Sequence, residues 1–149
     1  MAESRRKFRQ LRSSRDEQDA TAHFRERYGR PSGEPLRQLE RLVLGVDFGG
    51  NGYTTVGQAR LLAERLDLGP ASWLLDIGAG RGWPGLYLAQ ATGCRVVVTD
   101  LPHDAMHRAR ERAREEALSE RTAVVVASAR RLPFRYETFD AIVHTDVLC

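Results

Sequence analysis

The sequence has few cysteines and no long apolar run, and each shortage excludes a class of protein. Two cysteines, Cys94 and Cys149, are too few for a disulfide framework, which indicates a reducing, cytoplasmic compartment. The longest apolar runs, at residues 96–98 and 123–127, fall far short of the roughly 20 residues that a membrane-spanning helix needs. Because no apolar stretch follows the first basic residues, we also expect no secretory signal peptide.

Lysine is scarce as well, and the positive charge is unevenly placed. Lys7 is the only lysine among 23 basic residues, and the formal net charge is +3. Eleven basic and seven acidic residues occur up to Arg41, so the excess lies in the N-terminal arm. A basic arm can bind phosphates, but Asp16, Glu17 and Asp19 stand among these arginines, and aromatic residues are not regularly interleaved with them. We therefore expect a solvated helical arm that does not bind nucleic acid.

The remaining composition is that of one soluble globular domain, with 149 residues, 42% hydrophobic and 29% charged. Its N-terminal third predicts helices. Apolar spacing favours helices over residues 16–28 and 35–45, and the glycine cluster at 48–52 predicts a loop. Thr55 followed by Gln58 is a capping box, which opens a third helix.

From Ser72 onward, short apolar strands alternate with helices. Strands are expected at residues 73–77, 95–99, 123–126 and 139–144, with helices at 86–92 and 103–118. This alternation predicts an α/β fold, a Rossmann-like doubly wound parallel sheet with helices on both faces. We divide the chain into an N-terminal helical arm or cap, residues 1–52, and a core, residues 53–149.

The strongest local signal is the glycine-rich segment DIGAGRG at residues 76–82, between the first strand and a helix. Glycines at this place let the chain turn sharply and approach a ligand closely. The segment also begins a GxGxxG pattern at Gly80, which is the dinucleotide fingerprint. However, the carboxylate of Asp76 would repel a pyrophosphate and suits an ammonium group. Asp100, at the end of the second strand, is placed to accept hydrogen bonds from both hydroxyls of a ribose.

Three ordered segments together resemble the class I S-adenosylmethionine-dependent methyltransferases, in particular the broad small-molecule group. The matching segments are LLDIGAGRG at 74–82, VVTD at 97–100, and ASARRLPF at 127–134 running into FDAIV at 139–143. The resemblance covers residues 53–149 and implies strands in the order 3-2-1-4. It leaves the N-terminal arm unexplained, and the C-terminal half of the family's fold is apparently lacking.

The resemblance implies S-adenosylmethionine as the cofactor and assigns its contacts by position. They are Asp76 near the methionyl ammonium, Gly78, Gly80 and Gly82 along the cofactor, Asp100 at the ribose, and Ser128 and Ala129 beside the adenine. Many relatives carry an acid in place of Ser128, and an acid accepts from the adenine amine more strongly than a hydroxyl does. We therefore expect weaker cofactor affinity.

Three further positions carry open alternatives. Tyr53 either closes over the methionyl end or packs on the sheet as a loop aromatic. His144, after the fourth strand, is either the general base of an acceptor that must lose a proton or a strand-end histidine bonded to backbone. The pair His103 and His107 nearly matches a zinc-protease helix motif, but no third ligand lies nearby in sequence, so we expect an exposed helix start and no metal.

The sequence thus favours a methyltransferase that acts on a small molecule. One alternative is a non-catalytic module that binds S-adenosylmethionine, since the family's strands after the fourth are not recognisable. The other is a nicotinamide-dependent Rossmann enzyme, which would share Asp100 but leaves Asp76 unexplained. We also expect self-association through the open edge of the strand at residues 139–144.

Overall fold

The computed structural model describes residues 15–29, 33–47 and 53–145. Its helices are α1 (Arg15–Gly29), α2 (Glu34–Leu44), α3 (Val56–Arg65), α4 (Gly85–Thr92), α5 (His103–Glu115) and the short 3-10 helix η1 (Ser119–Arg121). Its strands are β1 (Trp73–Ile77), β2 (Arg95–Asp100), β3 (Thr122–Val126) and β4 (Ala141–Val143). The glycine cluster expected to form a loop at residues 48–52 lies outside the described residues.

The four strands form one parallel sheet in the order β3-β2-β1-β4, as predicted. In its register, Asp76 pairs with Val98 of β2 on one side and with Val143 of β4 on the other. The strand order reverses between β1 and β4. In an open parallel sheet, ligands bind at such a reversal, just beyond the carboxyl ends of the strands.

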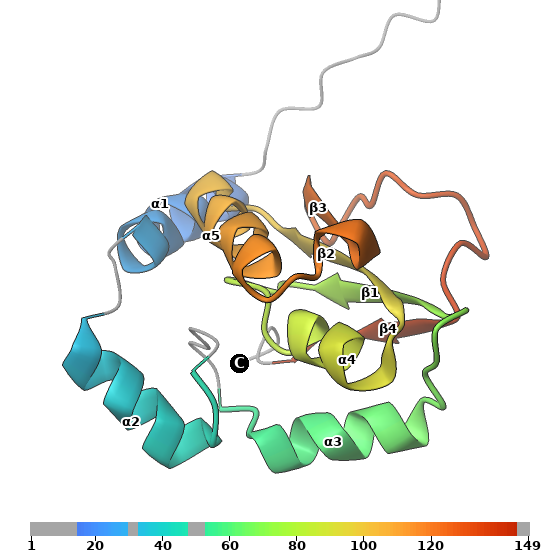
Figure 1. The fold of residues 1–149 in the computed structure, drawn as a ribbon. Helices are drawn as coiled ribbons and strands as arrows, with labels where there is room; N and C mark the ends of the chain where they lie inside the picture. Colours follow the sequence, from blue (N-terminus) through green and yellow to red (C-terminus); the bar gives the residue numbers. More distant parts are fainter. Residues whose placement is uncertain (1–14, 30–32, 48–52, 146–149) are drawn as a thin grey trace, which may run out of the picture.

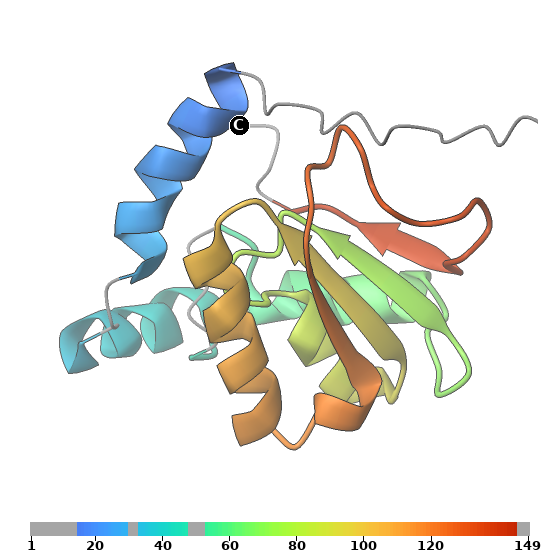
Figure 2. The same ribbon diagram turned by 90° about the horizontal axis from the view of Figure 1, so that it is seen from above.

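The helices that pack on the sheet share one face (Figure 2). Helix α4 packs on β1 and β2, α5 packs on β2 and β3, and α3 packs against α4. The two crossovers β1-α4-β2 and β2-α5-β3 run in the same direction, so right-handed connections place both helices on the same side. The expectation of helices on both faces therefore differs from the structure. In the described part of the chain, the connection from β3 to β4 crosses the other face without a helix, and its Phe134 and Phe139 rings meet edge to face at 5.0 Å.

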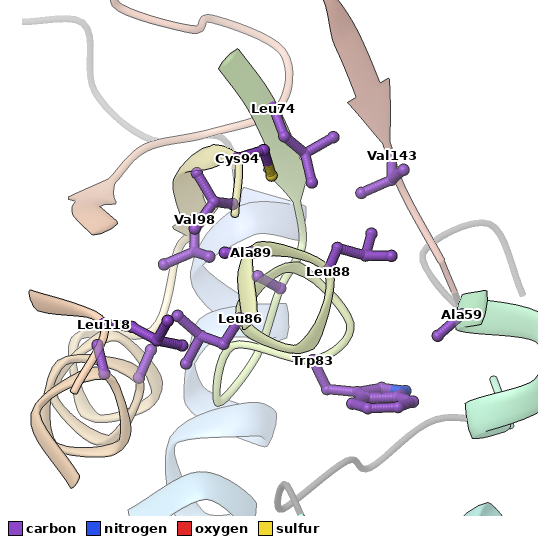
Figure 3. Packing of buried hydrophobic residues seen from close by; sticks show 14 of the residues in the cluster. Ala59, Leu74, Trp83, Leu86, Leu88, Ala89, Cys94, Val98, Leu118 and Val143 are labelled. Atoms are coloured by element: carbon purple, nitrogen blue, oxygen red, sulfur yellow. The ribbon is translucent and has the colours of Figure 1, made fainter. Parts of the chain in front are cut away.

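The core lies between this helical layer and the sheet (Figure 3). Leu86 and Leu88 of α4 meet Leu74 of β1 and Val98 of β2, and all four side chains are fully buried. From α5, the core receives Ala105, Ala109 and Ala113, which are all buried. Small side chains on α5 allow the helix to pack closely on β2 and β3.

The N-terminal helices follow their predicted positions within one residue or two. Helix α3 begins with the capping box, in which Thr55 accepts from the Gln58 backbone and the Gln58 side chain accepts from the Thr55 backbone. Helix α2 ends at Leu44 and is capped by Gly45, whose φ of +83° gives the left-handed turn that glycine adopts readily. Helix α1 lies beside α5 (Figures 1 and 2). No helix within the described ranges is both long and apolar enough to cross a membrane.

Strand β4 is shorter than expected because its first residues have other partners. The Asp140 backbone N–H donates to the Trp73 carbonyl at 2.9 Å, and the Asp140 carboxylate accepts from the Trp73 N–H at 2.7 Å. Asp140 therefore caps the start of β1, and regular pairing begins one residue later, at Ala141.

Candidate functional site

The glycine-rich loop between β1 and α4 has a backbone that only glycine adopts without strain. Gly78, Gly80 and Gly82 have φ values of +72°, +54° and +100°. A Cβ on Gly82 would also lie 2.4 Å from Cδ1 of Leu86, far inside van der Waals contact. The three glycines that the sequence places at the cofactor are thus required by the shape of the loop itself.

Hydrogen bonds join the glycine-rich loop to the carboxyl end of β2. The N–H groups of Gly78 and Ala79 donate to the Thr99 carbonyl at 2.8 and 3.0 Å, and the Thr99 hydroxyl donates to the Asp76 carbonyl at 3.1 Å. The Gly80 N–H donates to Oδ2 of Asp100 at 2.9 Å. These bonds hold the turn at the reversal point of the sheet.

Asp76 is the most deeply buried acid of this region, with 1% of its surface exposed. Its Oδ2 accepts from the Gly85 N–H at 2.8 Å, at the start of α4, whereas its Oδ1 is buried without a hydrogen-bond partner. Burial raises the pKa of Asp76 well above its ordinary value, and the nearby charge of Asp100 raises the pKa further, against the opposing effect of the Gly85 bond. A buried carboxylate oxygen of this kind favours a cationic or donor ligand.

Asp100 occupies the end of β2 with both carboxylate oxygens engaged. Oδ2 accepts from Gly80, and Oδ1 accepts from the Leu101 N–H at 2.7 Å. Burial raises the pKa of Asp100, while these two backbone bonds lower it. Each carboxylate oxygen accepts more than one hydrogen bond, so the side chain can hold the loop and still accept from a ligand hydroxyl.

Ser128 and Ala129 follow β3 and stand next to this site. The Ala127 N–H donates to the Asp100 carbonyl at 3.1 Å, which joins the end of β3 to the end of β2. The Ser128 hydroxyl accepts from the Arg130 N–H at 3.2 Å and donates to the carboxylate of Glu17 on α1. Ala129 is exposed.

Helix α1 supplies two residues that the sequence did not single out for the site. Besides Glu17, the buried Tyr28 lies on the loop, where a Cβ added to Gly80 would be 3.1 Å from the Tyr28 hydroxyl. The Arg81 side chain donates to the Tyr28 carbonyl at 3.3 Å. The signal available in the sequence was the spacing of positions 17, 21, 24 and 28, which places them on one helix face.

The remaining predicted residues lie at the surface. Tyr53 is 83% exposed. His144 is exposed at the carboxyl end of β4, one residue beyond Val143, the partner of Asp76 in the register. Both His103 and His107 are exposed on α5, where His107 lies 3.6 Å from Glu111. Across the residues that the structure describes, no group of three or more candidate ligands could hold a metal ion.

Replacing Gly82 by alanine is expected to lower the free energy of unfolding by about 2–4 kcal/mol, because the new Cβ meets Leu86 and the positive φ becomes strained. Urea denaturation measures this change. Gly69→Ala is the matched control, since a Cβ there has open space, and its effect is expected to stay within about 1 kcal/mol. Equal stability of the two variants would contradict this view of the loop.

Comparison with known proteins identifies the family from the sequence, and solved structures share the fold. Residues 74–149, about half of the chain, match the family described as a methyltransferase domain. Methyltransferase GfsG of Streptomyces halstedii is 37% identical over 81 residues, which are 54% of this chain and 29% of that protein. Glycine/sarcosine/dimethylglycine N-methyltransferase of Actinopolyspora halophila is 34% identical over 85 residues, which are 57% of this chain and 15% of that protein.

Among solved structures, a geranyl diphosphate methyltransferase in complex with SAM is similar with a TM-score of 0.59. It is 24% identical, and the match covers 82% of this chain and 46% of that one, so the likeness concerns the fold. The chain spans less than a third of the length of the two curated relatives that it matches.

Proposed function

Because the chain belongs to the methyltransferase domain family, we propose that it binds S-adenosylmethionine and transfers its methyl group to a small molecule. The observation that carries this proposal is the bond from Gly80 to Asp100, which joins the glycine-rich loop to the acid of the second strand at the reversal point of the sheet. The N-methyltransferase relative is named for glycine, sarcosine and dimethylglycine, which supports a small acceptor.

The residues at this edge of the sheet fit the proposed cofactor. Asp100 would hold the ribose hydroxyls, and Gly78, Gly80 and Gly82 would line the cofactor. The buried Oδ1 of Asp76, which has no hydrogen-bond partner, suits the methionyl ammonium. Ser128 and Ala129 would lie beside the adenine. A nicotinamide cofactor is a poorer fit, because its pyrophosphate would approach the buried carboxyl group of Asp76.

When bound, S-adenosylmethionine supplies a strongly electrophilic methyl group on a sulfonium. The protein then has to align the acceptor and exclude water. We assign proton removal to His144, which stands exposed at the sheet edge, for acceptors that must lose a proton. We propose that Tyr53 closes over the methionyl end of the cofactor. Its ring is exposed and would have to turn inward to do so.

Calorimetric titration separates the candidate ligands. We expect the chain to bind S-adenosylhomocysteine, the demethylated product, and not NADH; the reverse result would contradict the proposal. Labelled S-adenosylmethionine with a panel of small alcohols, amines and carboxylates then tests transfer. Binding without transfer to any of them would support the alternative of a non-catalytic binding module.

We further propose that residues 1–52 act as a cap on the core, residues 53–149. The contacts of α1 with the glycine-rich loop and with Ser128 support this division, because they join helix α1 to residues proposed to bind the cofactor. The low cysteine content supports a reducing, cytoplasmic compartment. The acidic residues among the arginines of the arm support a small-molecule partner and not nucleic acid.

Self-association through β4 is a separate prediction. Strand β4 stands at the edge of the described sheet, and Ile142 on it is 54% exposed. An edge with free N–H and C=O groups pairs readily with another chain. We expect light scattering to show a molar mass that rises with concentration, and Ile142→Lys to suppress the rise, because an edge lysine opposes pairing. A constant monomer mass over the full concentration range would contradict it.

A further inference from the structure

The carboxylate of Glu17 meets the end of β3 although it lies 111 residues earlier in the chain than Ser128, its partner. Glu17 stands in the first turn of α1, and its side chain is partly buried. The Ser128 hydroxyl donates its proton to Oε1 of Glu17 and accepts from the Arg130 N–H, so its direction is fixed. The structure thus places a negative charge beside a neutral residue of the proposed adenine site.

Two further contacts of α1 fix where Glu17 stands. At the far end of the helix, the Tyr28 ring lies on Gly80, and the Tyr28 carbonyl accepts from Arg81. Between them, Arg25 forms an ion pair with Asp104 of α5 at 3.3 Å. The helix therefore contacts the site from the glycine-rich loop to the end of β3. Such a multipoint contact holds one face of α1 against the site.

From this juxtaposition we propose that Glu17 is a specificity-determining residue, which accepts a hydrogen bond from the exocyclic amine of a 6-aminopurine ligand. The inference rests on the proposed function, since it needs the purine of S-adenosylmethionine at Ser128. Ser128 alone offers a neutral acceptor, whereas a carboxylate gives a charge-assisted bond. Under this proposal the acid that many relatives carry at the position of Ser128 is supplied from α1 by Glu17.

The chemistry of the purine decides which ligands Glu17 favours. The 6-amino group of adenine donates, whereas the 6-oxo group of hypoxanthine accepts, so that its oxygen and a carboxylate oxygen would face each other as two acceptors without a proton between them. Glu17 therefore discriminates at the 6-position between two ligands that differ there and at the adjacent N1, which accepts a hydrogen bond in adenine and carries a proton in hypoxanthine. A residue that merely docks α1 would affect both ligands equally.

The test compares S-adenosylhomocysteine with S-inosylhomocysteine, its 6-oxo analogue, by calorimetry. The wild-type chain is expected to prefer the adenosyl ligand, and Glu17→Gln to reduce that preference by about tenfold, because a neutral amide replaces the charged acceptor. Adding Ser128→Asp to Glu17→Gln is expected to return the preference, since it restores a carboxylate at the same place. Asp19→Asn, with the same charge change at an exposed position of α1, is expected to leave the preference unchanged.

The outcomes separate this inference from the proposed function. If the wild-type chain binds S-adenosylhomocysteine and Glu17→Gln keeps the full preference, or loses affinity equally for both ligands, the role of Glu17 is overturned and the proposed function stands. If the wild-type chain binds neither ligand, both are overturned. Loss of the preference in Glu17→Gln and its return in the double variant support the inference.

Discussion

Replacing Asp100 by alanine is expected to weaken the binding of S-adenosylhomocysteine by about 30- to 150-fold. The variant removes a carboxylate that would accept from ribose hydroxyls, and charge-assisted bonds of this kind contribute about 2–3 kcal/mol together. It also removes the acceptor of the Gly80 N–H, so the glycine-rich loop loses its bond to β2. Both losses act in the same direction, and calorimetric titration measures their sum.

Two further variants serve as controls for the effect of Asp100→Ala. Glu64→Ala removes an exposed acid from α3 and is expected to bind as the wild type does. Asp100→Asn retains one acceptor oxygen, so its affinity is expected to lie between those of the wild type and Asp100→Ala. Equal affinities of the wild type and Asp100→Ala would show that the ribose is not held by Asp100.

Replacing Asp76 by asparagine is expected to change stability and binding in opposite directions. Asp76 is buried with one oxygen unpaired, so removing its charge is expected to stabilise the ligand-free fold at neutral pH by about 1–3 kcal/mol. The amide oxygen can still accept from Gly85. In contrast, affinity for S-adenosylhomocysteine is expected to fall by about 100-fold, because an amide does not attract the methionyl ammonium as a charged carboxylate does.

The raised pKa of Asp76 makes the stability of the wild type depend on pH in a way that the stability of Asp76→Asn does not. Because burial raises the pKa in the folded chain, the folded state holds the proton more tightly than the unfolded state. The contribution of Asp76 to stability is fully present below the unfolded pKa, near 3.8, and is lost as the pH rises through the folded value. Urea denaturation across this window should show a steeper decline for the wild type than for Asp76→Asn. If the stability of the wild type and of Asp76→Asn declined equally with pH, the raised pKa of Asp76 would be contradicted.

Most of the fold was predictable because its signals are local. Residues 73–77 are an apolar run ended by glycines, and they form β1 with the predicted bounds. Thr55 and Gln58 form the predicted capping box, since both partners lie within one helical turn. The strand order required the family resemblance, because no local pattern shows that β4 pairs with β1 and not with β3.

The contacts that complete the site were not predictable, because they join residues that are far apart in the sequence. Glu17 and Ser128 are 111 residues apart, and a polar helix start gives no sign of what its side chains meet. Asp140 is not part of β4, because its carboxylate accepts a hydrogen bond from the Trp73 N–H. The two residues are 67 positions apart, so no local pattern indicates this contact. The complete burial of Asp76 depends on the close approach of α4. Gly85 begins this helix and has no side chain, and a Cβ there would collide with the Asp76 carboxylate.

The most direct test of the central claim is a crystal structure of the chain with S-adenosylhomocysteine. We expect the ligand to lie along Gly78, Gly80 and Gly82, with its ribose hydroxyls bonded to Asp100 and its adenine beside Ser128. Ligand density elsewhere on the molecule, with Asp100 bonded only to Gly80 and Leu101, would contradict it.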